Sequence, residues 1–305
     1  MVKQSVEASR LSEEHRQWLA GTGGVRLDFT NQTRNDFQMP EALLRKAILS
    51  GATMIEANLS GCDLSEADFS RADLRRSLLS AANLAGAELS GTDLQECWMT
   101  GCVLTESRMT RANLKNAHLE SARAIEVRLE DTTFAGADLK ASSFLQSRGS
   151  IVDFSNCILE GSDFRSVRFR SVKFTGARLL GSKLTDAKFE NADWNRADLS
   201  FCLFTRTASP RANFGNAVLH GSDFRDADLS GSDFRGADLS ECRLQGTSIH
   251  GCDFREANLL NARGLTSQQL SGARTDVKTT LPSGRKGPYP RNSGDERPMR
   301  IADPA

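Results

Sequence analysis

Seven cysteines are the residues of this sequence that could most directly bind a metal ion or form disulfides. They share one position of a five-residue period and are Cys62, Cys97, Cys102, Cys157, Cys202, Cys242 and Cys252. Alanine and serine alternate with cysteine at this position, a pattern that favours small core residues over metal ligands. We therefore predict neither a metal site nor a disulfide.

The other residue types that perform catalysis form no recognisable motif. His15, His118, His220 and His250 have no spacing that would place two of them on one helical face. The serines lack the G-x-S-x-G nucleophile motif, and no glycine-rich phosphate loop opens a helix. Carboxylates recur along the whole chain, so the spacing of any two of them does not indicate a catalytic pair. We expect no enzyme and no cofactor.

The charge balance argues against several classes of binding partner. The 305 residues include 39 basic and 39 acidic side chains, so no global charge draws the chain to nucleic acid or to an anionic membrane. There is no run of about 18 apolar residues for a membrane span. The N-terminal segment also lacks the apolar core of a secretory signal. We expect a cytoplasmic protein without direct nucleic-acid binding.

A five-residue repeat organises most of the chain. Residues whose numbers end in 4 or 9 occupy 44 positions from Leu44 to Leu259, and 41 of them are Leu, Phe, Met, Trp or Ile. The position two residues earlier, from Ala42 to Ala257, always holds Ala, Cys, Ser, Thr or Val. A period of five matches neither a helix nor a flat strand. It predicts short extended steps with two inward residues each, separated by turns.

This stretch resembles the pentapeptide-repeat family, in which A-D-L-x-x units recur as in Ala67-Asp68-Phe69 and Ala237-Asp238-Leu239. The resemblance covers about residues 42–263 and implies an all-β fold, a right-handed quadrilateral β-helix with four repeats per coil. The 44 repeats then make about eleven coils, and residues 20 apart stack at roughly 4.8 Å.

Like residues fall into columns at this spacing, as the stacked coils require. An aromatic column holds Phe134, Phe154, Phe174, Trp194, Phe214, Phe234 and Phe254. Gly149 and Ser209 interrupt the large inward position on one predicted face. Losing a large core residue usually costs about 2–5 kcal/mol, so these positions indicate either a local bend or bulge, or decay of the repeat. We favour decay.

The segments on either side of the repeat are expected to close it, because a terminal coil exposes its core and its backbone. We assign residues 1–41 to an N-terminal helix, from Ser12 to about Ala20, and a capping segment in which residues 30–41 interrupt the pattern. Residues 264–282 form a C-terminal capping segment that starts with a capping box at Thr266 and a short helix. Residues 283–305 are expected to be a disordered tail.

Two outward columns are candidate partner-binding sites. The first is basic and consists of Arg108, Arg128, Arg148, Arg168 and Lys188. Such a row repels itself unless anions interleave, for which Glu130, Asp131 and Glu190 are available. The column is therefore either a solvated, partly paired face or a site for an acidic partner.

The second column places Leu78, Trp98 and His118 on one outward face. Clustered outward apolar residues can mark an interface, and we predict that Trp98 anchors a contact. Further outward apolar residues are Val103, Ile125, Leu145, Ile151, Ile158, Leu180, Phe201 and Leu203.

These features favour a non-catalytic scaffold that presents a rigid β-helical surface to unidentified protein partners, as a monomer or a homodimer. One alternative is a DNA-mimicking gyrase binder of the quinolone-resistance type. However, residues 42–262 hold 26 bases and 29 acids, whereas a duplex mimic needs strong negative charge. The other alternative is a secreted bacterial effector that recruits host proteins, an analogy with the family alone.

Overall fold

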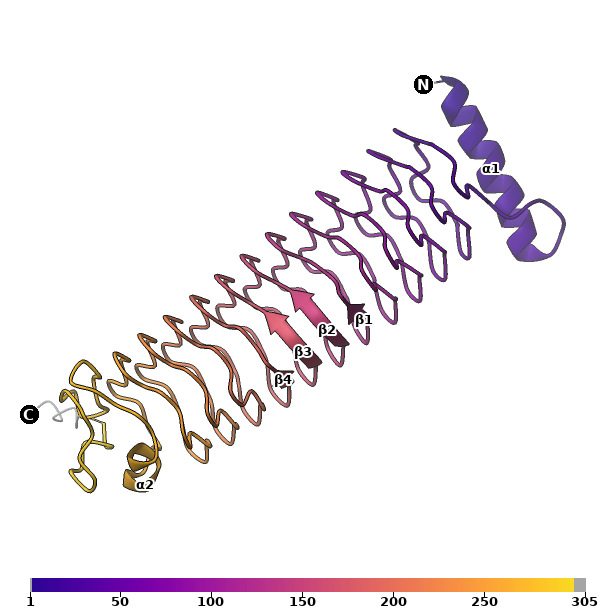
Figure 1. The fold of residues 1–305 in the computed structure, drawn as a ribbon. Helices are drawn as coiled ribbons and strands as arrows, with labels where there is room; N and C mark the ends of the chain where they lie inside the picture. The colour runs from indigo at the N-terminus through magenta and orange to yellow at the C-terminus, as the bar shows by residue number, and fades with distance from the viewer. Residues whose placement is uncertain (1, 299–305) are drawn as a thin grey trace, which may run out of the picture. The chain divides into compact units, whose positions relative to one another are not determined.

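The computed structural model describes residues 2–298. Its helices and strands are α1 (Val2–Ala20), β1 (Arg128–Glu130), β2 (Arg148–Asp153), β3 (Arg168–Lys173), β4 (Lys188–Glu190) and α2 (Ser267–Ser271) (Figure 1). The chain divides into two compact units between Ile158 and Leu159. Neither helix combines the length and apolar character of a membrane-crossing helix, a statement that covers the described residues.

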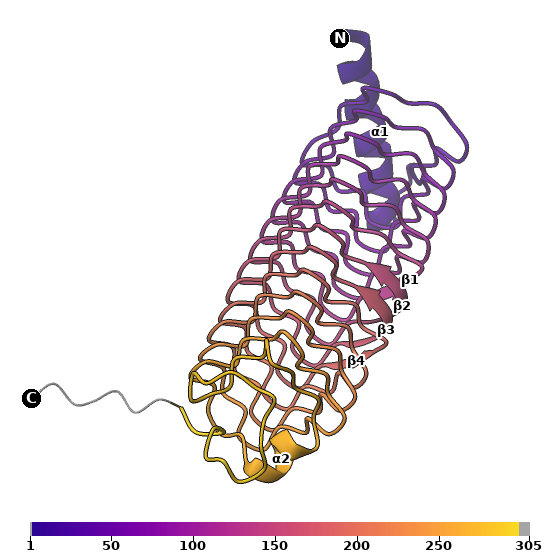
Figure 2. The same cartoon turned by 60° about the vertical axis from the view of Figure 1, so that its left-hand side comes forward.

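Each unit is a β-helix solenoid in which residues 20 apart pair in parallel. In the first unit Ile48 pairs with Asp68, and in the second Asp193 pairs with Asn213. Most of these pairs are isolated bridges; longer pairing occurs between β1 and β2 in the first unit and between β3 and β4 in the second. The turns of consecutive coils of the first unit align in columns (Figure 2). The register confirms the predicted spacing of one coil per 20 residues.

The chain turns every five residues through a residue with positive φ. Glycine provides this conformation at Gly61 (φ 66°), but Glu56 and Arg71 adopt it as well, both at φ 59°. A left-handed residue that is not glycine costs roughly 1–2 kcal/mol. The hydrogen bonds around each turn offset this cost: the N–H of Ala57, for example, donates to the Met54 carbonyl at 3.2 Å. The fold therefore tolerates side chains at its turns.

The two inward positions of each repeat fill the interior. Ala67 and Phe69, for example, have no exposed surface. Aromatic rings stack in the second unit, where the centroids of Phe174 and Trp194 lie 4.2 Å apart with an interplanar angle of 2°. In the first unit Phe134 stacks on Phe154 at 4.9 Å. These rings confirm the predicted aromatic stacking within each unit.

Two of the three exceptions to the large inward position, Gly149 and Ser209, have specific structural surroundings. Gly149 lies in β2, and a Cβ atom there would be 2.1 Å from the carbonyl oxygen of Leu129. Ser209 lies beside Trp194, whose Nε1–H donates to the Ser209 hydroxyl at 3.4 Å. The first position has no room for a side chain, and the second provides a partner for a buried indole.

The N-terminal segment differs from the prediction in two ways. Helix α1 begins at Val2 and not at Ser12, and the backbone of residues 30–41 keeps the coil geometry, with Thr33 bridged to Thr53. Only the side chains depart from the repeat here. Arg34, at an inward position, pairs with Glu7 of α1 at 2.9 Å and lies 4.8 Å from the ring centroid of Phe29. The interruption in sequence is thus a place where α1 contacts the first coil.

At the other end, Thr266 and Gln269 form the predicted capping box of α2. The following chain continues the pairing, because Arg274 bridges to Asp253 in parallel. We predicted disorder from residue 283, whereas residues 283–298 have defined contacts, among them a bond from the Ser283 hydroxyl to Asp295 at 2.8 Å. Residues 299–305 of that predicted tail lie outside the described residues.

Candidate functional site

The cysteine side chains are structural. The Cys202 thiol donates to the Leu179 carbonyl at 3.0 Å, 23 residues earlier in the chain, and the Thr207 hydroxyl makes the same kind of bond to Leu184 at 2.7 Å. This shared bond explains why Cys, Ser and Thr interchange at the small inward position. Burial raises the pKa of Cys62 to about 11 and that of Cys102 to about 12. Neutral thiols of this kind are poor nucleophiles and poor metal ligands.

Within residues 2–298, no three His, Cys, Asp or Glu side chains are grouped so that they could hold a metal ion. His15 contacts backbone groups of the first coils, whereas His220 shares a hydrogen bond with Ser240 at 2.9 Å. Because the interior of each unit is filled, chemistry or binding must use the outer faces.

The predicted column of Leu78, Trp98 and His118, here called the aromatic column, forms one continuous strip of the first unit. Parallel bridges join Leu78 to Trp98 and Trp98 to His118. The Trp98 and His118 rings stack with centroids 4.0 Å apart and an interplanar angle of 14°. Trp98 is 48% exposed and Leu78 is 39% exposed. The stack therefore holds an indole in a defined orientation while leaving half of its surface open to solvent.

Polar residues end the aromatic column on both sides. Asn58 precedes Leu78 and Asp138 follows His118 in the same series of bridges. Beside the column, the Thr100 hydroxyl bonds to Glu120 at 3.1 Å. This arrangement is an apolar centre of three coils with a polar rim, which is the general anatomy of a protein interface.

The predicted basic column divides between the two units. Arg108, Arg128 and Arg148 occupy consecutive coils of the first unit, and Arg168 pairs in register with Lys188 in the second. Arg108 approaches Glu88 at 3.8 Å. Among the described residues, the other four cations have no carboxylate partner within ion-pair distance.

Two of the three anions expected to interleave with the basic column, Glu130 and Glu190, have other partners. Glu130 accepts a hydrogen bond from the Ser150 hydroxyl, and Glu190 pairs with Arg170 at 3.0 Å. Arg128 and Arg148 line a shallow depression together with Gln146, Glu126 and Glu130. The depression carries charges of both signs.

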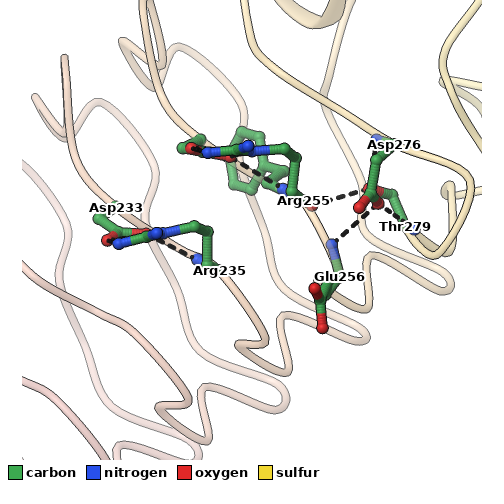
Figure 3. A network of polar contacts seen from close by, with 8 residues as sticks. Asp233, Arg235, Arg255, Glu256, Asp276 and Thr279 are labelled. Carbon is green, nitrogen blue, oxygen red and sulfur yellow. Dashed lines mark hydrogen bonds and ion pairs between the residues drawn. The ribbon is translucent and has the colours of Figure 1, made fainter.

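Several acidic residues of the second unit pair with an arginine two residues later in the chain. The Arg235 side chain donates three hydrogen bonds to the Asp233 carboxylate (Figure 3). Arg255 donates the same three bonds to Asp253. The hydrogen bonds from Arg235 are the main cause of the lowered pKa of Asp233. These two carboxylates are therefore neutralised by neighbours on their own face.

The sequence analysis missed a second apolar surface, in the second unit. Leu180, Phe201, Leu203 and Val218 are 43%, 56%, 41% and 41% exposed, and the Phe201 ring meets that of His220 edge to face at 5.3 Å. We call these five residues the apolar corner. Three of them were recognised as outward apolar residues but not as neighbours. They lie in different columns of the 20-residue coil, on either side of one turn, so the column reasoning did not group them.

Pentapeptide-repeat family models match most of the coiled region. The first matches residues 41–71, 67–106, 112–144, 152–186 and 182–208, and a second matches residues 214–258. Together they cover more than half of the chain. No protein of curated function shows significant similarity to it.

Solved structures of pentapeptide-repeat proteins also align with the chain. HetL, involved in heterocyst differentiation regulation in the cyanobacterium Nostoc, is 24% identical, with 89% of this chain and 97% of HetL covered and a TM-score of 0.32. Full-length QnrB1, a plasmid-mediated fluoroquinolone resistance protein, is 19% identical, with coverages of 73% and 91% and a TM-score of 0.29. Rfr23 from the cyanobacterium Cyanothece is 21% identical, with coverages of 43% and 92% and a TM-score of 0.27.

Proposed function

Because the chain belongs to the pentapeptide-repeat family, we propose that it is a non-catalytic protein-binding module whose main contact is the aromatic column. The observation that carries this proposal is the half-exposed Trp98, stacked at 4.0 Å on His118. Solvent-facing positions of this fold normally hold polar groups, so an ordered indole at one of them needs a reason. A protein partner that covers it provides that reason.

The energetics support Trp98 as the anchor. Tryptophan is enriched among the few interface residues that dominate binding free energy, and a side chain already fixed by stacking loses little conformational entropy on binding. Leu78 extends the apolar area by one coil, and the polar residues Asn58 and Asp138 bound it. The partner surface should accordingly be apolar at its centre and polar at its edge.

The proposal includes the finer architecture that the family implies. We assign about eleven right-handed, four-sided coils to residues 42–263, and we propose that α1 and the segment around α2 close the two ends. A closed solenoid keeps its outer faces in a fixed register, which is what a binding module of this kind requires.

A gyrase-binding function is less well supported by the charges. Residues 42–262 hold 29 acids against 26 bases, and the arginine forks on Asp233 and Asp253 neutralise acids one by one. A mimic of duplex DNA needs an unscreened row of negative charge. No feature of the described residues favours the secreted-effector alternative over the binding module.

Affinity purification from the cells of origin, read by mass spectrometry, tests the proposal. We expect a protein captured by the wild-type chain to be lost with Trp98→Ala. It should be retained with Ile151→Ala, which removes another exposed apolar side chain of the same unit. Arg148→Glu separates the two columns, because loss with this variant alone would assign binding to the basic column. A captured protein that is indifferent to Trp98→Ala contradicts our proposal.

A further inference from the structure

The basic column of the first unit is a row of exposed cations at regular spacing. Parallel pairing places Arg108, Arg128 and Arg148 in register on consecutive coils, and each of these side chains is exposed. Glu88 precedes them in the same column and lies 3.8 Å from Arg108. Neither Arg128 nor Arg148 forms an ion pair with any of the described residues. On coils about 4.8 Å apart, their guanidinium groups repel each other, and an external anion would relieve that repulsion.

Other arginines of this unit are paired within the chain. Arg75 pairs with Asp73 at 2.7 Å, and a second ion pair of this kind joins Arg76 to a glutamate one coil earlier at 2.8 Å. By contrast, the side chains of Arg128 and Arg148 donate no hydrogen bond to the described residues. A guanidinium can present two parallel N–H donors to one carboxylate. The basic column therefore keeps such donors available to a partner.

Carboxylates border the column on both sides without pairing with it. On one side Glu126 lies at the turn that precedes Arg128, with φ 56°. On the other side Glu130 accepts a hydrogen bond from the Ser150 hydroxyl. Both glutamates share a depression of about 560 Å³ with Arg128 and Arg148. The surface is therefore a positive central row between negative borders, and not a uniformly basic patch.

The coil spacing selects the shape of a partner that contacts all three cations. Three coils are two steps apart, about 9.6 Å in all. Residues i, i+3 and i+6 or i+7 of an α-helix lie on one face and span about 9 to 10.5 Å along its axis. Residues i, i+2 and i+4 of an extended strand span about 13 Å. A helix that runs along the column therefore matches the spacing of the cations, whereas an extended segment does not.

We propose that the basic column of the first unit binds a protein helix that carries a row of Glu or Asp residues bordered by Lys or Arg. The acidic row accepts hydrogen bonds from the guanidinium groups of Arg128 and Arg148, and Arg108 completes the row. The basic borders lie against Glu126 and Glu130. Nucleic acid and other polyanions carry charge of one sign and would meet these two carboxylates unfavourably. Charge complementarity therefore selects a helix of mixed charge.

The proposed contact is separate from the aromatic column. Arg108 follows Trp98, and Arg128 follows His118, by ten residues, which is half of a 20-residue coil. The two columns therefore lie on different faces of the first unit. A helix bound to the basic column leaves Trp98 open, so each proposal can fail without the other.

Fluorescence anisotropy with the full-length chain at low salt tests the proposal with two labelled helical peptides that contain equal numbers of Glu and Lys. The first peptide has a row of Glu between two rows of Lys, and the second has a row of Lys between two rows of Glu. We expect the wild type to bind the first at least about tenfold more tightly than the second. Equal affinity for the two peptides contradicts the proposal. So does displacement of the first peptide by heparin at a lower concentration than by the same peptide without its label.

Charge reversal within the column provides the matched comparison. Arg148→Glu should weaken binding of the first peptide by about tenfold. Lys115→Glu makes a similar change of charge at an exposed residue of the same unit outside the column and should bind as the wild type does. An equal loss with Lys115→Glu would show that net charge alone attracts the peptide and would overturn the proposal.

A double variant, Arg128→Glu with Arg148→Glu, adds a readout that loss of folding cannot imitate. It should lose the first peptide and bind the second more tightly than the wild type does, because the sign of the central row is reversed. A double variant that binds the second peptide no better than the wild type does would contradict the proposed pairing.

Discussion

The backbone N–H of Leu27 donates to Nδ1 of His15 at 2.8 Å, and this bond fixes the ring of a fully buried histidine. Since Nδ1 accepts, Nε2 carries the proton and donates to the Arg45 carbonyl at 2.9 Å. Both ring nitrogens are therefore used by the coils that α1 contacts. A protonated ring would direct a second hydrogen at the Leu27 N–H.

The first prediction is that α1 loosens in mild acid. Burial is the main cause of the lowered pKa of His15, with a further contribution from the nearby charge of Arg26. Because the folded pKa lies below the 6.5 of an ordinary histidine, this contact stabilises fully above pH 6.5 and loses stability as the pH falls below it. Hydrogen-exchange protection of residues 2–20 should fall between pH 7.5 and pH 5.

His15→Ala should lower that protection at pH 7.5, by the equivalent of about 1–3 kcal/mol for the polar groups left without partners, and remove its pH dependence. His250→Ala, on the exposed surface, should leave the wild-type profile intact. A pH response that persists in His15→Ala would assign the effect to another group.

The second prediction concerns the coupling of Trp194 and Ser209. Ser209→Leu restores the repeat consensus but displaces the hydroxyl that accepts from the indole, so it should destabilise the chain by about 1–3 kcal/mol through overpacking. Combining it with Trp194→Phe should cost less than the sum of the single changes. Additive shifts in chemical denaturation would show that the two positions are independent.

The third prediction is that glycine is required at position 149. Gly149→Ala places Cβ against the Leu129 carbonyl and should destabilise by roughly 1–3 kcal/mol or more. Gly101→Ala is a suitable control, because its turn has φ 67° and open space around the new Cβ, so the cost is limited to about 1 kcal/mol. Equal losses in thermal stability for the two variants would contradict the close approach.

The fourth prediction is that the thiols are inert in the folded chain. A thiol reagent at pH 8 should modify the seven cysteines only slowly in the native state and all of them in denaturant. Burial raises the pKa of every one, and least for Cys62, at about 11. Cys62 should consequently react first, as peptide mapping of partially modified protein can determine. Rapid modification of another cysteine would indicate local opening of its coil.

The sequence predicts the coil register because two constraints repeat without a slip: a small and a large inward residue in every five. The position of Trp98 on His118 followed from the same arithmetic, since residues 20 apart share a column. This reasoning works wherever burial alone decides the residue type.

The structure differs from the sequence prediction where contacts outside the repeat determine which residue stands at a position. Residues 30–41 keep the coil because their backbone bonds to the next coil, for example from the Arg34 N–H to the Thr53 carbonyl at 2.7 Å. The Arg34 side chain nevertheless contacts Glu7 of α1. The need for glycine at position 149 comes from a carbonyl 20 residues away. The apolar corner depends on which faces adjoin at a turn, and composition does not carry that information.

Some turns hold glycine, as at Gly181, whereas others hold Glu56, Arg71 or Phe201 at a similar positive φ. This tolerance has an evolutionary consequence. A point mutation at any of these turns changes what the outside displays while leaving the interior untouched. Each unit therefore presents exposed side-chain positions at a fixed spacing, where the recognised surface can change while the buried core stays the same.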